Sequence, residues 1–230
     1  MFEKLICAAI VVAVVGTASV PKVEDEGHKA PSKRATTSFV APDEATKRLV
    51  DGNRRFVNND ATHPNQTAEH RLALAKGQKP FAVVVTCSDS RVCPEIIFDQ
   101  GLGDLFVVRV AGNSVGDVEL GSIEYAVEHL GAKLILVLGH ENCGAVDAAI
   151  KGGETHGHIG DVTSPLKPAV DATKGYLGNV LDAAVRHNAK YVADSLRVRD
   201  SLFKQNIAKG EVRVFGARYD LDSGLVEILD

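Results

Sequence analysis

The chain has no tryptophan and a single methionine among its 230 residues, and aromatic side chains make up only 5% of it. A methionine-rich recognition surface is thereby excluded. Basic residues are not in excess, because 26 Lys and Arg stand against 30 Asp and Glu, for a formal net charge of -4. We therefore expect no nucleic-acid partner, since such a partner needs a basic stripe. With 45% hydrophobic and 24% charged residues, the composition predicts a globular chain with one sizeable core and, by default, one domain.

The apolar run near the N-terminus is too short for a comfortable membrane span. Leu5–Val15 follows Lys4 and precedes the small residues Gly16-Thr17-Ala18, a pattern that signal peptidase reads. We expect a signal peptide over residues 1–18 and export, which in a bacterium leads to the periplasm; an uncleaved anchor is the alternative. No stable membrane span is expected after processing. Residues 19–42 are polar and punctuated by proline, which predicts a linker.

Two short polar stretches follow apolar runs of strand length. Phe81–Thr86 leads into Cys87-Ser88-Asp89-Ser90-Arg91, and Leu134–Gly139 leads into His140-Glu141-Asn142-Cys143. Continuous apolar runs of this length are typical of buried parallel strands. Because ligands bind in the crevice at the carboxyl ends of such strands, two cysteines and a histidine can converge there although they lie far apart in sequence.

Two thiolates and an imidazole are zinc ligands, and this set is catalytic when water takes the fourth position. Zinc then lowers the pKa of the bound water to about 7 and makes hydroxide available. Asp89 and Arg91 follow Cys87 closely. An arginine beside an aspartate keeps the carboxylate ionised, so that Asp89 could orient a zinc-bound hydroxide toward a substrate.

These two stretches together resemble the paired signature of the β-class carbonic anhydrases, and the similarity runs from about Glu44 to the C-terminus. The resemblance implies reversible hydration of carbon dioxide to bicarbonate and a proton by attack of zinc-bound hydroxide. It implies one zinc per subunit and a homodimer or homotetramer. The residues that it assigns are Cys87, His140 and Cys143 to zinc, Asp89 and Arg91 to the catalytic dyad, and Gln78, Phe106 and Tyr125 to the substrate pocket, with Gln78 acting across a dimer interface.

Two positions differ from the sequence that is usual in that family. Cys93 stands where the family commonly has proline, and it could be a small buried hydrophobe, a competing zinc ligand or an oxidisable thiol. Val84 stands where some members carry a tryptophan that helps bicarbonate to close the site through the aspartate. We therefore expect an open site without such a bicarbonate switch.

Strand-like and helix-like segments alternate along the rest of the chain, which predicts an α/β fold. We expect a mostly parallel central sheet of about four strands, an antiparallel C-terminal edge strand, flanking helices and an N-terminal helical arm, within a domain spanning residues 43–230. The expected helices cover residues 43–59, 67–76, 121–130, 145–150 and 179–201, and the strands beyond the two above cover 105–110, 212–219 and 225–229.

Other activities remain open at this point. The same zinc machinery could hydrolyse carbon disulfide or carbonyl sulfide. A bicarbonate-binding module without catalysis and a structural zinc protein are further alternatives, although a structural site would be expected to close with a fourth protein ligand such as Cys93. His156 and His158 could form a second metal site or move protons, yet they lie in a glycine-rich loop with no thiol nearby.

Overall fold

The computed structural model describes residues 39–199 and 201–229, with the side chains of 201–203 left aside. The expected signal peptide and most of the expected linker lie outside the described residues. Within them, no helix combines the length and the apolar character that crossing a membrane requires.

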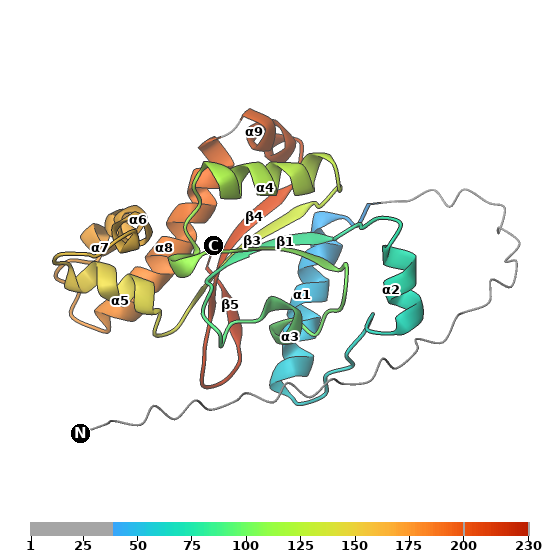
Figure 1. The fold of residues 1–230 in the computed structure, drawn as a ribbon, viewed down its shortest axis with the longest axis horizontal. Coiled ribbons are helices and arrows are strands. Elements are labelled where there is room, and N and C mark those ends of the chain that lie inside the picture. Colours follow the sequence, from blue (N-terminus) through green and yellow to red (C-terminus); the bar gives the residue numbers. More distant parts are fainter. Residues whose placement is uncertain (1–38, 200, 230) are drawn as a thin grey trace, which may run out of the picture. The chain divides into compact units, whose positions relative to one another are not determined.

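A five-stranded sheet forms the centre of the described chain (Figure 1). Its strands are β1 Ala82–Thr86, β2 Leu105–Arg109, β3 Leu134–His140, β4 Arg213–Tyr219 and β5 Val226–Ile228, in the order β2-β1-β3-β4-β5. The first four are parallel and β5 pairs antiparallel with β4. This arrangement confirms the predicted sheet and its edge strand.

Helices connect the strands and flank the sheet. They are α1 Pro42–Val57, α2 Ala68–Leu74, α3 Pro94–Ile97, α4 Asp117–Glu128, α5 Gly144–Lys151, α6 Ile159–Thr163, α7 Lys167–Ala172, α8 Val180–Arg199 and α9 Ser201–Ala208, with 3-10 turns η1 Ala111–Asn113 and η2 Ser164–Leu166. The expectation that a helix begins at Gly121 was wrong by one turn. The Glu119 carboxylate accepts a hydrogen bond from the Gly116 amide, which satisfies a free N–H at the start of α4.

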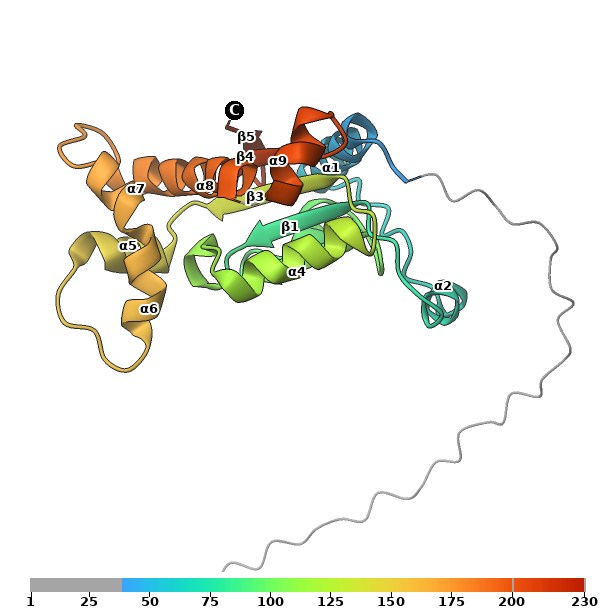
Figure 2. The ribbon, with the colours of Figure 1, turned by 90° about the horizontal axis from the view of Figure 1, so that it is seen from above.

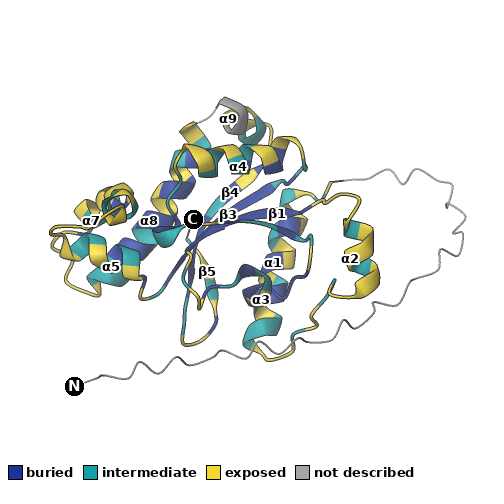
Figure 3. Cartoon of the chain, viewed as in Figure 1, coloured by how far each residue is buried: buried dark blue, intermediate teal, exposed yellow. Residues whose placement is uncertain are grey.

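Each face of the sheet is covered by its own apolar layer. Residues that alternate along the strands, such as Val83 and Val85 in β1, pack beneath α4 and α8. Their neighbours Ala82 and Val84 face α1 and α3. All five residues of β1 and all seven of β3 are buried, as Figure 3 shows by the dark blue of the central strands. The two strands are therefore fixed side by side, and both run toward the same edge.

The N-terminal helices differ in how they use their surfaces. α1 buries Ala45 and Leu49 against the sheet of its own chain. α2 buries no residue, and Figures 2 and 3 show it standing apart from the sheet with most of its surface exposed. Its start is capped by Thr67, whose hydroxyl accepts from the His70 amide at 3.1 Å. The N-terminal helical arm of the prediction thus consists of one helix packed on the sheet and one that is exposed.

Candidate metal centre and active site

Three buried ligand-type side chains meet at the carboxyl edge of the sheet. Cys87 directly follows β1, His140 is the last residue of β3 and Cys143 precedes the first residue of α5. Their ligand atoms all lie within 4.8 Å of one another, and the two sulfur atoms are 3.9 Å apart. The residues are between 0 and 5% exposed. The structure thus brings together the three residues that the sequence predicts as metal ligands.

The turn between β3 and α5 places two of the ligands. Asn142 adopts a positive φ of 51°, which asparagine tolerates better than most residues and which turns the chain sharply between His140 and Cys143. Cys143 is the N-cap of α5, so the helix begins directly after it, as predicted, and the free amides of the first turn are close to this residue. The amides of Ala145 and Val146 favour the thiolate there.

The two thiols titrate as a pair. Contact with the Cys143 thiol lowers the pKa of Cys87, helped by the Gly112 amide, although burial opposes this. The same contact, together with burial, raises the pKa of Cys143. One thiolate therefore forms readily in this pocket, whereas a second one beside it needs a neighbouring positive charge.

The histidine supplies the best test of whether a metal fits. Its Nδ1 atom lies 2.8 Å from the Glu141 carbonyl oxygen, which can only accept, so Nδ1 carries the proton. Nε2 is then a bare acceptor, fully buried, and finds no hydrogen-bond partner among the described residues. A buried unsatisfied nitrogen facing two sulfur atoms is costly by itself and suits a soft divalent cation such as zinc.

Asp89 and Arg91 form a two-point ion pair beside this group. Arg91 donates from Nε to Oδ1 at 2.9 Å and from Nη2 to Oδ2 at 2.7 Å, and its amide also donates to Oδ1 at 3.0 Å. Arg91 lowers the pKa of Asp89, so the carboxylate stays ionised. Its Oδ2 lies 3.8 Å from His140 Nε2, too long for a hydrogen bond but near enough to face the same small space.

Three further residues hold the Cys87 segment. The resemblance placed the turn that contains Gly112 at the site entrance, whereas the sequence analysis missed Arg109 and Asn188. Arg109, which is paired with Thr86 across β1 and β2, donates to the carbonyl oxygens of Cys87 at 3.2 Å and Asp89 at 2.8 Å. The Gly112 amide donates to the Cys87 sulfur at 3.3 Å. Asn188, from α8, donates to the Gly112 carbonyl oxygen at 2.9 Å. Only the position of Arg109 at a strand end could have signalled its role.

Gly112 is required by its own geometry. Its φ is 76°, a value that L-residues rarely adopt, and an added Cβ would lie 2.9 Å from a Leu166 methyl carbon. This conformation turns the amide toward the thiol, so the glycine belongs to the site although it carries no side chain.

The predicted substrate residues lie elsewhere. Gln78 is exposed and precedes β1, whereas Cys87 follows it, so the length of the strand, about 16 Å, separates them. Phe106 is paired with Val83 near the start of β1, and the Tyr125 ring lies 6.4 Å from the Phe106 ring. The structure brings Phe106 and Tyr125 together but does not bring them or Gln78 to the metal ligands of the same chain.

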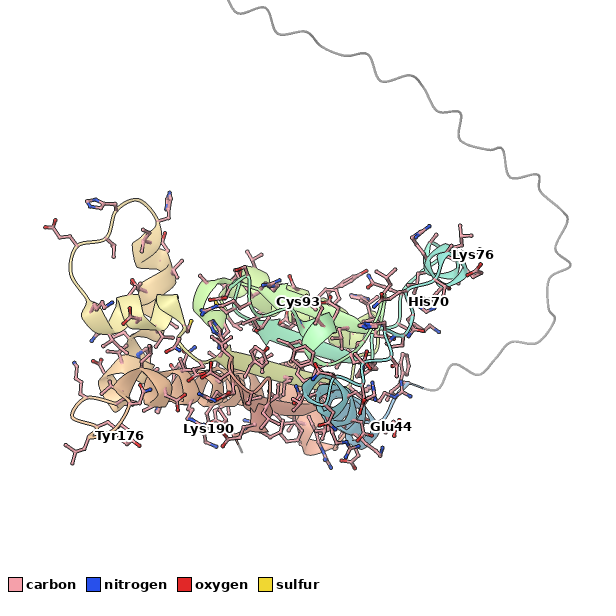
Figure 4. The ribbon with its side chains drawn as sticks, turned by 90° about the horizontal axis from the view of Figure 1, so that it is seen from below. Glu44, His70, Lys76, Cys93, Tyr176 and Lys190 are labelled. Atoms are coloured by element: carbon pink, nitrogen blue, oxygen red, sulfur yellow. The ribbon has the colours of Figure 1, made fainter. Side chains whose placement is uncertain are left out.

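The remaining candidate ligands stay outside the centre. Cys93 is half-buried, its sulfur lies 3.8 Å from a Glu95 carboxylate oxygen, and it does not belong to the metal-type group of the described residues. Figure 4 shows it within the layered part of the chain, away from His70 on α2 and from Lys76, which follows that helix. His156 and His158 are exposed and form no metal-type group with other described residues.

The sheet is mostly parallel, and its carboxyl edge carries a buried Cys2His group beside an Asp–Arg pair. This combination is typical of a metal-dependent α/β enzyme. A family model described as carbonic anhydrase matches residues 82–226. The chain is 45% identical over 194 residues to carbonic anhydrase 2 of Mycobacterium tuberculosis, covering 82% of this chain and 93% of the relative. It is 34% identical over 201 residues to a carbonic anhydrase of Pseudomonas aeruginosa, covering 79% and 86%.

Solved structures agree with these relatives. A β-carbonic anhydrase from Coccomyxa, in complex with acetazolamide, superposes with a TM-score of 0.65 at 29% identity, covering 79% of this chain and 84% of that one. A tetrameric β-carbonic anhydrase from Sordaria macrospora gives 0.65 at 25% identity, covering 80% and 96%. The chain belongs to the β-class carbonic anhydrase family of enzymes.

Proposed function

We propose that this chain catalyses the zinc-dependent, reversible hydration of carbon dioxide to bicarbonate and a proton, with Cys87, His140 and Cys143 holding the zinc ion. The observation that carries the proposal is the bare, buried Nε2 of His140 beside two thiols, with an ionised carboxylate 3.8 Å away. When bound, zinc supplies Lewis acidity that makes hydroxide available near neutral pH.

Asp89 and Arg91 have separable tasks in this proposal. An ionised carboxylate can accept a hydrogen bond but has no proton to donate, so Asp89 orients the attacking hydroxyl and leaves its lone pair free for carbon dioxide. Arg91 donates a hydrogen bond to each carboxylate oxygen of Asp89, which fixes the plane of the carboxylate and keeps it charged. Arg109 holds the backbone of the same turn, so the dyad and Cys87 keep their spacing.

The substrate pocket, in this proposal, is completed by a second copy of the chain. Gln78, Phe106 and Tyr125 lie too far from the metal ligands to act within one subunit, and Tyr125 is 49% exposed. Apolar and polar groups at that end are thus available to the crevice of a partner. A solved relative is described as tetrameric, which supports a homodimer or homotetramer here.

The test is the hydration rate of zinc-loaded protein measured by stopped flow, with zinc content determined in parallel. Asp89→Asn should keep zinc and lose hydration by about 10²- to 10⁴-fold, the range of a positioned acid–base group. Asp60→Asn, at an exposed aspartate remote from the dyad, is the matched control and should keep the full rate.

Two results would count against the proposal. An unchanged rate in Asp89→Asn would remove the dyad from the mechanism. No hydration by zinc-loaded wild-type protein would refute the function, and the same preparation assayed with carbonyl sulfide or carbon disulfide would then show whether a sulfur analogue is the substrate.

We also propose that residues 1–18 direct export to the periplasm and are removed after Ala18. The support is the sequence pattern of Lys4, an apolar run and small residues before the cleavage point. N-terminal sequencing of the chain from a periplasmic extract tests it: a start at Ser19 is expected, and an intact Met1 in the cytoplasmic fraction would refute it.

A further inference from the structure

We propose that Glu141 and Arg218 are positioning residues that set the orientation of His140, and so the strength with which the site holds zinc. This inference rests on the proposed zinc site. Neither side chain belongs to the group of metal ligands, so both would act only through the backbone that carries His140.

The starting point is the single hydrogen bond that orients the imidazole. His140 Nδ1 donates to the carbonyl oxygen of Glu141, its immediate neighbour, at 2.8 Å. Any movement of that carbonyl rotates the ring and displaces Nε2, the atom left bare toward the two thiols. Groups that fix the position of the Glu141 carbonyl therefore also fix the direction of His140 Nε2.

Glu141 is held by several groups of the segment that ends β4. Its amide donates to the Tyr219 carbonyl oxygen at 2.9 Å, in continuation of the β3–β4 pairing. Its Oε2 accepts from the Leu221 amide at 3.2 Å, and its Oε1 lies 3.5 Å from Arg218 Nη2. The backbone amide and the side chain of Glu141 are thus both anchored.

Arg218 is itself immobilised. Its side chain is 9% exposed, and it donates from Nε to Asp182 Oδ1 at 2.6 Å and from Nη1 to Asp220 Oδ2 at 2.7 Å. Asp182, on α8, also accepts from Arg186, which pairs with Glu227 of β5 at 2.8 Å. A buried guanidinium with three carboxylates around it is held in one conformation. It therefore keeps the Glu141 carboxylate in a fixed position.

The network could in principle serve only to join α8, β4 and β5. Glu227 shows what such a role looks like, because it is the cross-strand partner of Arg218 and its carboxylate pairs with Arg186 on α8, so it joins β5 to β4 and α8. Glu141 differs, since its carbonyl oxygen accepts the hydrogen bond that His140 Nδ1 donates. The two glutamates therefore form a matched pair of sites in one network.

The test compares Glu141→Ala, Glu141→Gln and Glu227→Gln in the full-length protein. Zinc dissociation constants are measured by competition with a chelator, the absorption spectrum of the cobalt(II)-substituted protein reports ligand geometry, and thermal melting of the metal-free protein reports folding. Glu141→Ala should weaken zinc binding about 10- to 100-fold, the usual cost of losing an outer-shell partner of a metal ligand. Its cobalt spectrum should shift.

Glu141→Gln should recover part of the zinc affinity, because its amide oxygen can still accept from the Leu221 amide although the charge facing Arg218 is gone. Glu227→Gln should keep wild-type zinc affinity and an unshifted cobalt spectrum, even where its melting temperature falls. Arg218→Lys should fall between Glu141→Gln and Glu141→Ala, because a lysine cannot hold several carboxylates in fixed directions.

Wild-type zinc affinity and an unshifted spectrum in Glu141→Ala would overturn the inference, as would equal losses in Glu141→Gln and Glu227→Gln. Either result leaves the proposed function standing so long as the wild-type protein binds zinc and hydrates carbon dioxide. A wild-type protein that binds no zinc would overturn both together. If Glu141→Ala does not fold, the comparison of Glu141→Gln with Glu227→Gln decides.

Discussion

The two ends of the central sheet differ in what one chain can complete. At the carboxyl end, Cys87, His140 and Cys143 are buried and within 4.8 Å of one another, with a network of side chains behind them. At the amino end, Gln78 is exposed and Tyr125 is half-exposed. The contrast teaches that the fold of one chain is enough to bring the metal ligands together, whereas Gln78 and Tyr125 stay exposed in it.

The difference has a physical cause. A metal site needs ligand atoms held in one fixed geometry, which the packed interior and the parallel strand register provide within this chain. Groups that bind a small substrate can be delivered across an interface, because two surfaces of moderate size dock with comparable precision. The following experiments test each end of the sheet in turn.

The largest expected effect is loss of the metal from the carboxyl end. Cys87→Ser replaces a thiolate with a weak hydroxyl ligand, so zinc content should fall from one per chain to near zero and hydration should disappear. Cys93→Ser is the matched control, because Cys93 is a half-buried thiol outside the group. Zinc analysis of both variants measures the difference, and a loss of zinc in Cys93→Ser would place a third thiol in the site.

The second expected effect tests whether Gln78, at the amino end of the sheet, acts on the metal site at the carboxyl end of another chain. Gln78→Ala should keep zinc and lower the hydration rate about 10-fold, the order expected for one lost hydrogen bond to a reacting group. Refolding Gln78→Ala together with Cys87→Ser should restore part of the rate, because a mixed dimer has one crevice with an intact metal site and an intact Gln78. Stopped flow on the mixture, against each variant refolded alone, makes the measurement.

Absence of any recovery in the mixture would show that Gln78 acts within its own chain or not at all. The control is a mixture of Cys87→Ser with Cys143→Ser, in which both crevices of every dimer lack a metal ligand. That mixture should stay inactive.

The third effect concerns stability near the amino end. The Asp99 side chain is buried and accepts from the Thr62 amide, the His63 amide at 2.8 Å and Arg55 Nε at 2.5 Å, which ties α1 to the segment before α2. Burial alone would raise the pKa of Asp99, but these donors hold it at about 2. Asp99→Asn should lower the free energy of unfolding by about 2 kcal/mol at neutral pH.

The pH dependence follows from the sign of that shift. Because the pKa of Asp99 is lower in the folded chain than its ordinary value of 3.8, its contribution is complete above about pH 4 and is lost as pH falls toward 2. Denaturant titrations over this range should show a shallower acid loss in Asp99→Asn. Asp147→Asn, on the exposed side of α5, serves as the control and should keep the wild-type slope. An identical slope in Asp99→Asn would refute the assignment.

The smallest expected effect is that of bicarbonate. Val84 is fully buried in β1, where it packs toward α1 and α3, and it offers no polar group for an anion. Bicarbonate should therefore slow hydration only as a product does, without a cooperative loss of rate at mildly acidic pH. Initial rates at several pH values, with and without added bicarbonate, measure this, and a sigmoidal loss deepened by bicarbonate would show that Asp89 can leave Arg91.

The sequence by itself determined the parts of this protein that are local. Two apolar runs of strand length, followed by Cys87 and ending before His140, predicted the buried parallel strands and the sheet edge at which the metal ligands meet. These features could be predicted because each depends on residues that are neighbours in the sequence. The Asp89–Arg91 pair could be predicted for the same reason, because two residues of spacing in a turn suffice for contact.

Only the tertiary structure decided the contacts between distant segments. Sulfur atoms 56 positions apart meet at 3.9 Å because β1 and β3 are adjacent in the sheet. Arg109, Asn188 and Arg218 were missed because the role of a polar side chain depends on its partner, and their partners lie on other segments of the chain. Whether an arginine joins a buried network or stays at the surface depends on how the elements pack, and packing is a property of the whole fold.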